Sequence, residues 1–109
     1  MGYSIKTISV FEKQARRLSR KYPSLKKNLL GLVDLLKENP ETGASLGNNC
    51  YKIRMAISSK SKGKSGGARI ITHIVVADQF VYLLSIYDKS EKADLTDGEL
   101  KQLLKGILQ

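Results

Sequence analysis

The chain has 109 residues, a formal net charge of +9 and an isoelectric point near 9.8. At this length we expect a single domain, residues 1–109, with one modest hydrophobic core. The excess of Lys and Arg favours a polyanionic partner such as nucleic acid. One cysteine excludes an intramolecular disulfide framework, and no apolar stretch approaches the roughly 18 residues of a membrane span. We therefore expect a cytoplasmic protein that does not enter a membrane.

The first elements expected along the chain are a strand and a helix. Alternation around Ile5 indicates a short strand over residues 3–8. Ser9 and Glu12 have the spacing of a capping box, which predicts that a helix begins there. Pro23 ends this helix, because proline disfavours a helical conformation in the residue before it.

A second helix is expected directly after the first. Ser24 is its predicted N-cap, and leucines recur at the spacing of one broad apolar face. The pair Asn39-Pro40 ends this helix. We expect the polar stretch 43–49 that follows to be a connector without regular structure.

The C-terminal half predicts three strands and a final helix. The strands are expected over 51–57, 68–77 and 80–87. Asp78 and Gln79 would join the last two strands in a tight hairpin. Thr96 is the predicted N-cap of the last helix, with Glu99 as its capping-box partner. The predicted fold is α+β, an antiparallel β-sheet with two N-terminal helices packed on it and a C-terminal helix, in the order βααβββα.

The stretch between Glu41 and Asp78 concentrates positive charge and contains no acid. Its six basic residues are Lys52, Arg54, Lys60, Lys62, Lys64 and Arg69. Because like charges repel one another in a compact chain, this concentration favours a partner that supplies phosphate groups. The three lysines at 60, 62 and 64 belong to a Lys/Ser/Gly segment that we expect to be a loop contacting RNA.

Strand alternation assigns the residues of 51–57 to two faces of the sheet. Lys52 and Arg54 would project together from one face, while the alternate apolar residues join the core. Arg69 would lie close to them if its strand pairs antiparallel with theirs. A pair of cations on a strand is usually a solvated outer face, but the convergence of three favours a functional site. We expect both arginines to be partly exposed on one concave surface.

Other candidate sites are weaker. Gly63, Lys64 and Ser65 match the end of a phosphate-binding loop, but Ser58 stands where the motif requires glycine and a strand follows instead of a helix. His73 lies within a strand, where a structural hydrogen bond is a more common role than that of a catalytic base. One His and one Cys offer no metal-ligand spacing, so we expect neither a metal nor another cofactor.

Three stretches of the sequence resemble the RelE/HigB toxins of bacterial type II toxin–antitoxin systems. They are residues 50–54, the Lys- and Gly-rich stretch 60–71, and residues 82–95. The resemblance extends over nearly the whole chain in the order of its elements and is closest to the HigB-type branch. It implies a ribosome-dependent endoribonuclease that cleaves mRNA in the ribosomal A site and is held inactive by a cognate antitoxin protein.

The resemblance also implies site residues, mainly Lys and Arg on the central strands and in the loop after the last strand. Carried over to this sequence, the catalytic residues are Lys52, Arg54, Arg69 and Lys89. Tyr87 and Glu91 would add contacts to RNA. RelE has a tyrosine in its C-terminal segment, where this chain has the aromatic-free stretch 94–97. Two roles are open for Tyr87: it replaces that tyrosine, or it is a core aromatic at the end of its strand.

In the implied reaction, the ribose 2′-hydroxyl attacks the adjacent phosphate while a base removes its proton and cations stabilise the phosphate oxygens. Neighbouring cations lower the pKa of a lysine from its ordinary value of about 10.4, which makes it a better base. Lys52 beside Arg54 is such an arrangement, and Lys89 would protonate the leaving 5′-oxygen. Which lysine is the base stays open.

Two other functions also fit the sequence. A ParE-like toxin shares this fold and binds DNA gyrase without cleaving nucleic acid, but it generally lacks the basic catalytic residues. A non-catalytic RNA-binding or ribosome-associated module needs cations as much as a nuclease does, so composition does not separate the two.

Overall fold

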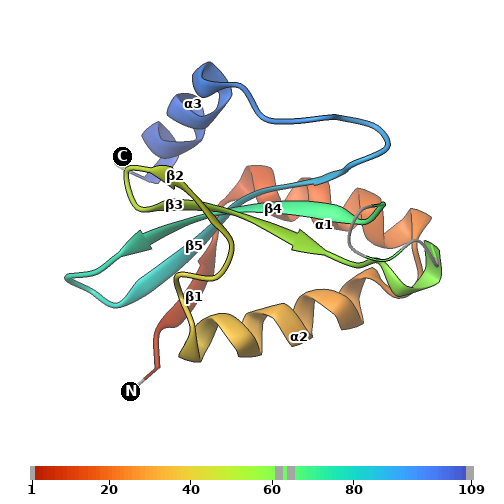
Figure 1. Ribbon diagram of the computed structural model, residues 1–109, viewed down its shortest axis with the longest axis horizontal. Coiled ribbons are helices and arrows are strands. Elements are labelled where there is room, and N and C mark those ends of the chain that lie inside the picture. The colour runs from red at the N-terminus through yellow and green to blue at the C-terminus, as the bar shows by residue number, and fades with distance from the viewer. Residues whose placement is uncertain (1, 61–62, 64–65, 108–109) are drawn as a thin grey trace.

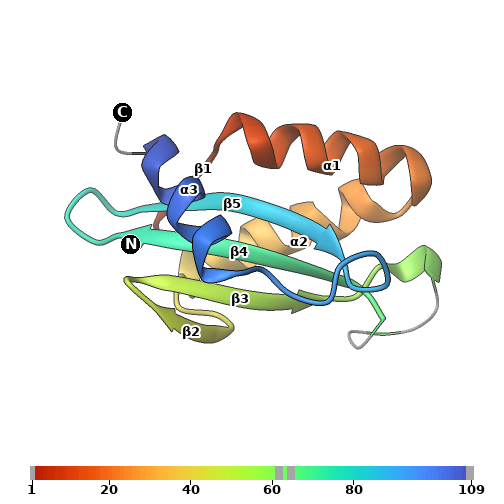
Figure 2. The same cartoon turned by 90° about the horizontal axis from the view of Figure 1, so that it is seen from above.

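A five-stranded sheet forms the centre of the structure, with α2 and α3 on opposite faces and α1 along the β5 side (Figures 1 and 2). The computed structural model describes residues 2–60, 63 and 66–107. In chain order the elements are β1 (Ser4–Thr7), α1 (Ser9–Lys21), α2 (Leu25–Glu38), β2 (Ala44–Gly47), β3 (Cys50–Met55), the 3-10 helix η1 (Ser58–Lys60), β4 (Ala68–Val75), β5 (Phe80–Asp88) and α3 (Asp97–Ile107). The predicted α+β class is confirmed, with one strand more than expected.

The sheet is mixed, whereas a purely antiparallel sheet was expected. Its strand order is β1-β5-β4-β3-β2, and β1 pairs with β5 in parallel while all other neighbours are antiparallel. Two helices and three strands separate β1 from β5 along the chain, so no hairpin turn imposes an antiparallel arrangement on this pair.

The additional strand is β2, which lies where a connector was expected. All four of its residues are exposed, so no apolar alternation marks the strand in the sequence. Asn48 and Asn49 have φ angles of 53° and 59°, as the two central positions of a type I′ hairpin turn require, and Gly47 pairs with Cys50 across this turn. Backbone pairing with β3 therefore creates a strand from a polar sequence.

The main core lies between one face of the sheet and the first two helices. It contains Phe11, Leu18, Leu25, Leu32 and Leu36 from the helices, and Ile53, Met55, Ile70, Ile74, Val81, Leu83 and Ile86 from the strands. The predicted alternation within β3 is confirmed, because Ile53 and Met55 are buried here while Arg54 is exposed. Among the described residues, no helix has the length and apolar character needed to cross a membrane.

The opposite face of the sheet carries a smaller apolar cluster. Its buried residues are Ile71, Leu84 and Tyr87, and α3 covers them with partly buried leucines. No residue of α3 itself is fully buried. The predicted capping box at the start of α3 is confirmed, because the Glu99 N–H donates to the Thr96 hydroxyl at 3.1 Å and the Thr96 N–H donates to the Glu99 carboxylate at 3.0 Å.

The other two helices begin differently from the prediction. Ile8 is the N-cap of α1, and Ser9 is already the first helical residue. The hydroxyl of Thr7 donates to the carboxylate of Glu12 in place of the expected Ser9 contact. Ser24 precedes α2 as predicted, but its hydroxyl donates to the side chain of Asn28 and makes no capping bond to the backbone.

A buried carboxylate at the end of β5 joins three parts of the chain. Asp88 is fully buried and accepts hydrogen bonds from the Tyr22 hydroxyl, from Lys60 Nζ at 2.9 Å and from the Ser90 hydroxyl at 2.7 Å. Burial alone would raise the pKa of Asp88, but hydrogen bonds from Tyr22, Ser90 and Lys60 outweigh it and hold the pKa well below its ordinary value. These hydrogen bonds hold the end of α1, η1 and the loop after β5 in fixed positions relative to one another.

Replacing Asp88 with Asn should lower the free energy of unfolding at pH 7 by about 3–5 kcal/mol, because it leaves the Lys60 ammonium without its buried counter-charge. A depressed carboxylate pKa stabilises the fold above the ordinary value of about 3.9, and this contribution is lost as the pH falls further. The difference between wild type and variant should therefore shrink below about pH 4. Urea unfolding followed by circular dichroism at pH 7 and pH 3 measures both effects.

Asp34→Asn is the matched control, because Asp34 is 79% exposed and its 3.7 Å ion pair with Lys37 lies on the surface of α2. Its stability should stay within about 0.5 kcal/mol of wild type. Equal stability of Asp88→Asn and wild type at pH 7 would contradict the role assigned to Asp88.

Candidate nucleic-acid interface

Strand register brings four of the predicted site residues onto one face of the sheet. Arg54 in β3 lies opposite Arg69 in β4, and Arg69 lies opposite Tyr87 in β5. Because directly opposed residues project from the same side, the three side chains form a row across three strands. Lys52 stands two residues before Arg54 on the same side of β3. We call Lys52, Arg54, Arg69 and Tyr87 the basic sheet face.

Lys52 is held by an acid that was not among the predicted residues. Its Nζ lies 3.2 Å from Asp94 Oδ1, and the same oxygen accepts hydrogen bonds from the Tyr87 hydroxyl at 3.3 Å and from the Leu95 N–H at 2.9 Å. The bonds from Leu95 and Lys52 lower the pKa of Asp94. Asp94 is the first residue of the stretch 94–97, which stands where RelE has a tyrosine. That position was the only feature of the sequence that pointed to Asp94.

The two arginines differ in exposure. Arg54 is exposed, as expected, but Arg69 is only 5% exposed, so the expectation of two partly exposed arginines is wrong for Arg69. Arg69 belongs to the central strand of the sheet and has neighbours on both sides. One of its guanidinium nitrogens donates to the carbonyl oxygen of Ala68 at 3.2 Å. Arg54 is therefore the arginine of this face that a ligand reaches directly.

Of the two roles left open for Tyr87, the structure shows that of a core aromatic, and its replacement of the RelE tyrosine stays a prediction. Tyr87 is buried in the cluster with Ile71 and Leu84, while its hydroxyl reaches Asp94. Burial and the nearby carboxylate of Asp94 raise the pKa of Tyr87 to about 12. The phenol is therefore protonated at neutral pH and acts as a hydrogen-bond donor, not as a base.

The remaining predicted lysines have different surroundings. Lys89 is exposed at the start of the loop after β5, with its Nζ 3.4 Å from the carbonyl oxygen of Ala93. Lys60 was expected in an RNA-contacting loop, but its side chain is only 11% exposed and its ammonium is bonded to Asp88. Lys60 therefore supports the fold from within. Lys62 and Lys64 lie outside the described residues.

Glu91 was also expected to contact RNA, and the structure directs it to α1 instead. Its carboxylate accepts from Arg17 at 2.8 Å and from Lys21 at 3.0 Å. These two bonds lower the pKa of Glu91. Glu91 is therefore separate from the basic sheet face and ties the loop after β5 to the helix.

His73 lies toward the other end of β4, opposite Cys50. Its Nδ1 is 3.4 Å from the Cys50 sulfur, and burial lowers the pKa of His73. Because β-strand residues rise by about 3.3 Å each, four residues separate His73 from Arg69 by roughly 13 Å. The imidazole therefore stands apart from the arginines of the basic sheet face.

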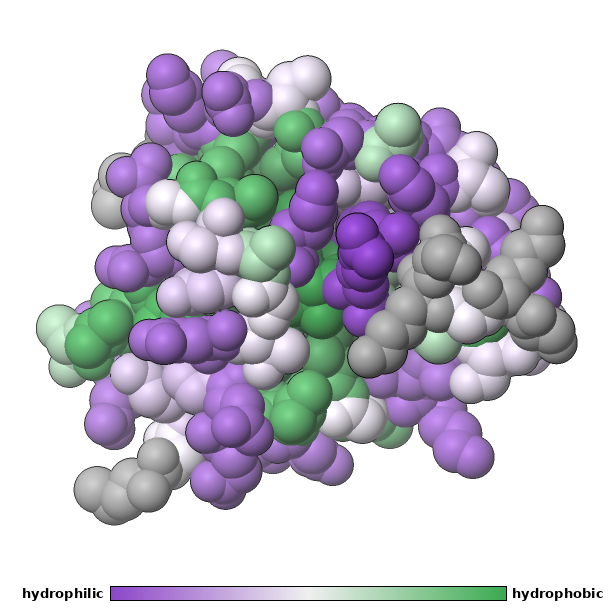
Figure 3. Space-filling view, viewed as in Figure 1, coloured by the Kyte–Doolittle hydropathy of each residue, from purple (hydrophilic) through white to green (hydrophobic). Residues whose placement is uncertain are grey.

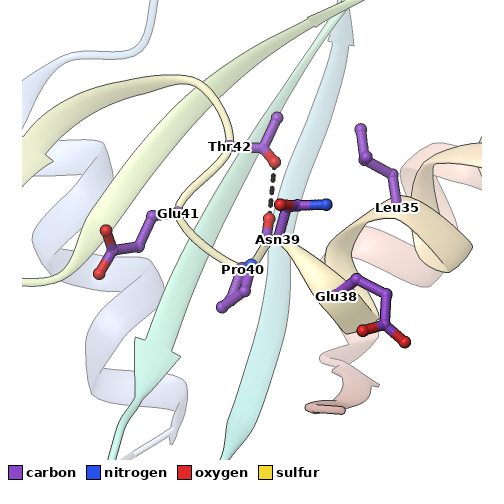
Figure 4. Close-up of a pocket in the computed structure, with 6 residues that line it drawn as sticks. All are labelled: Leu35, Glu38, Asn39, Pro40, Glu41 and Thr42. Carbon is purple, nitrogen blue, oxygen red and sulfur yellow. Dashed lines mark hydrogen bonds between the residues drawn. The ribbon is translucent and has the colours of Figure 1, made fainter. Parts of the chain in front are cut away.

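A wide hollow of about 660 Å³ at the end of α2 does not suit RNA (Figure 4). It is lined by Leu35, Glu38, Asn39, Pro40, Glu41 and Thr42. The Thr42 hydroxyl donates to the Asn39 carbonyl oxygen at 2.6 Å and closes the turn there. Two glutamates repel phosphate, and none of the lining residues belongs to the basic sheet face.

Comparison with known proteins agrees with this fold. Free E. coli RelE, as a double arginine-to-alanine mutant, has a TM-score of 0.65 and 18% identity over 96% of this chain and 97% of that chain. A RelBE toxin–antitoxin complex from Mycobacterium tuberculosis gives 0.58 and 11% identity over 81% and 99%. The intact E. coli RelBE complex gives 0.54 and 23% identity over 79% and 95%.

The sequence itself matches a protein family over most of its length. Residues 8–107 match the family described as the RelE toxin of the RelE/RelB toxin–antitoxin system. The matched range runs from the start of α1 to the end of α3 and includes the whole basic sheet face. The chain therefore belongs to the RelE toxin family.

Proposed function

We propose that this toxin is a ribosome-dependent endoribonuclease that cleaves mRNA through attack of a ribose 2′-hydroxyl on the adjacent phosphate. The observation that carries the proposal is the basic sheet face, where Lys52, Arg54 and Arg69 gather on one side of three paired strands. Such a concentration of cations suits a phosphate group that gains charge in the transition state.

Arg54 is proposed to bind the scissile phosphate. Its guanidinium is exposed, and its planar fork of donors matches two phosphate oxygens. Arg69 lies directly opposite and is buried, so it adds positive charge from a fixed position beneath the phosphate. Because Arg69 is buried, its charge acts more strongly than it would in bulk solvent.

Lys52 differs from the two arginines, because its ammonium forms an ion pair with Asp94 in the free chain. As an ion pair its ammonium stabilises phosphate charge. It accepts a proton from the 2′-hydroxyl only as the neutral amine, after it has separated from Asp94 and released a proton to solvent. As the new bond between the 2′-oxygen and phosphorus forms, the bond to the 5′-oxygen breaks. Lys89, exposed at the start of the neighbouring loop, is the proposed donor of a proton to that leaving oxygen.

The proposed partners are the ribosome with its mRNA and a cognate antitoxin. Two of the similar solved structures are toxin–antitoxin complexes, and the chain belongs to the same toxin family. A RelB-like antitoxin is therefore the expected protein partner. The ribosome would supply the in-line geometry of the RNA backbone that a small, open sheet face does not impose by itself.

A ParE-like gyrase inhibitor is the main alternative. Gyrase inhibition does not require residues that bind a phosphate. The three cations on adjoining strands repel one another and lower the stability of the fold, so a function that uses them is favoured over gyrase inhibition. A non-catalytic ribosome-binding module would need the charges, but it would not need Arg54 and Arg69 directly opposite each other.

Purified toxin added to a cell-free translation system should cleave mRNA when ribosomes are present and leave the same mRNA intact without them. DNA supercoiling by gyrase should proceed at the same rate with and without toxin. Denaturing gels of labelled mRNA and a supercoiling assay with plasmid DNA measure the two effects. Inhibited supercoiling with intact mRNA would establish the ParE-like alternative.

Arg54→Ala should lower the single-turnover cleavage rate of ribosome-bound mRNA by about a hundredfold or more at saturating toxin. Arg54→Lys should restore only part of the rate, because an ammonium does not reproduce a bidentate contact. Binding to ribosomes should change far less than the rate, since the contact is strongest in the transition state.

Lys26→Ala is the control, because Lys26 is an exposed cation of α2 outside the basic sheet face. It should cleave at the wild-type rate. Arg69→Ala should lower both the rate and the stability, because Arg69 is buried, whereas Arg54→Ala should leave the circular dichroism spectrum and the melting temperature unchanged. Wild-type cleavage by folded Arg54→Ala would remove Arg54 from the mechanism.

A further inference from the structure

The exposed side of α1 carries a row of cations that is separate from the basic sheet face. Its members, which we call the α1 cation row, are Lys13, Arg16, Arg17, Arg20 and Lys21. The first four recur at the helical spacing i, i+3, i+4 and i+7, so they project from one side of the helix. Phe11 and Leu18 bury the opposite side in the core.

Most of this row is not neutralised within the chain. Glu91 bonds to two members, Arg17 and Lys21. The other three members have no hydrogen-bond or ion-pair partner in the part of the chain that the structure describes. Like charges four residues apart destabilise a helix, and the row contains three such pairs. An anionic partner from outside the chain would relieve this repulsion.

The contact with Glu91 shows that the row binds an oxyanion. The two terminal nitrogens of Arg17 lie 2.8 Å from Oε1 and 3.5 Å from Oε2 of the carboxylate, and Lys21 Nζ lies 3.0 Å from Oε2. Two oxygens of a phosphate fit the same fork of donors. The side chains of Arg17 and Glu91 are 59% and 34% exposed. Ion pairs this exposed are weak, so an external phosphate can replace Glu91.

The shape of the row favours the backbone of structured RNA over other polyanions. Lys13 and Arg20 are about 10 Å apart along the helix axis, and a nucleic-acid duplex presents about six phosphates over that length. Phe11 is the only aromatic residue of α1 and it is buried, so the row offers no ring on which a single-stranded base could stack. Cations fixed on a helix therefore suit phosphates that are fixed on a duplex.

Glu91 also links the row to the loop that carries the proposed proton donor. This loop, residues 89–96, joins β5 to α3 and contains both Lys89 and Asp94 (Figure 1). The surface around it, at the upper right in Figure 3, is mainly hydrophilic. Asp88 before the loop is buried and Asp94 is bonded to Lys52, so Glu91 is the contact between the middle of the loop and α1.

We propose that the α1 cation row binds the phosphate backbone of structured RNA and that Glu91 is an internal competitor that the RNA displaces. The inference rests on the proposed function, in which the ribosome supplies the RNA, and adds a contact outside the basic sheet face. Displacement of Glu91 frees the middle of the loop that carries Lys89. Binding at α1 is thereby coupled to the position of the proposed proton donor.

The first test measures binding to a short, blunt-ended RNA duplex without ribosomes. The triple variant Lys13→Gln, Arg16→Gln, Arg20→Gln removes the members of the row that have no partner. It should bind at least about tenfold more weakly at low salt, and the slope of log affinity against log salt should become shallower by about two to three. Circular dichroism checks the fold, which should be unchanged because all three side chains are exposed.

The matched control removes the same charge elsewhere. Lys37→Gln, Lys101→Gln, Lys105→Gln changes three exposed cations of α2 and α3 and should weaken duplex binding less than about threefold. Equal losses in the two triple variants would show an effect of net charge alone and overturn the proposal. Polyglutamate that binds wild type as tightly as the duplex does would assign the row to an acidic protein and overturn it as well.

The second test concerns the internal competitor. Glu91→Gln should bind the duplex about twofold to fivefold more tightly than wild type, whereas Glu38→Gln, which removes an exposed acid at the end of α2, should bind as wild type does. Addition of the duplex to wild type should shift the NMR amide signals of Lys89 and Lys92, and Glu91→Gln should show these shifts without RNA. Equal or weaker binding by Glu91→Gln, or shifts confined to α1, contradicts displacement of Glu91.

The third test separates this inference from the proposed function. With ribosome-bound mRNA, the triple variant of the row should need at least about tenfold more toxin for half-maximal cleavage, while its rate at saturating toxin stays within about twofold of wild type. An unchanged half-maximal concentration refutes the inference and leaves the endoribonuclease proposal standing. Duplex binding that depends on the row, with no cleavage of any mRNA by wild type, supports the row and refutes the endoribonuclease.

Discussion

The carboxylate of Asp88 connects three segments of the chain at the end of β5. It accepts hydrogen bonds from Tyr22 at the end of α1, from Lys60 in η1 and from Ser90 after β5. The backbone N–H of Lys89 also donates to the carbonyl oxygen of Gly67 at 3.0 Å, beside the start of β4. Removing one partner of a buried ion pair leaves an uncompensated charge and costs stability. The position of each of these segments therefore depends on the others.

Positive charge is concentrated at the basic sheet face, and this concentration lowers the stability of the fold. Arg54 and Arg69 oppose each other across β3 and β4, and like charges in this arrangement are destabilising. Asp94 offsets part of that repulsion in the free chain through its bond to Lys52. A bound phosphate would offset it more fully, which links the unfavourable arrangement of these cations to the proposed reaction.

The sequence predicts those parts of the fold that depend on local patterns, and it fails where distant residues meet. The apolar alternation of β3 and the capping box at Thr96 are both present as predicted. The strand β2 has no apolar pattern, and its Asn48-Asn49 turn was the signal that was overlooked. The ion pairs of Lys60 and Glu91 were not predicted, because their partners are 28 and at least 70 residues away along the chain.

Analysis of the RNA ends produced by the toxin tests the central claim most directly. If the basic sheet face promotes attack by the 2′-hydroxyl, the upstream fragments of ribosome-bound mRNA carry 2′,3′-cyclic phosphates and the downstream fragments carry 5′-hydroxyls. Mass spectrometry of the fragments, and labelling by polynucleotide kinase without prior dephosphorylation, identifies these ends. Fragments with 3′-hydroxyl and 5′-phosphate ends would contradict the account, because they require attack by water in place of the ribose hydroxyl.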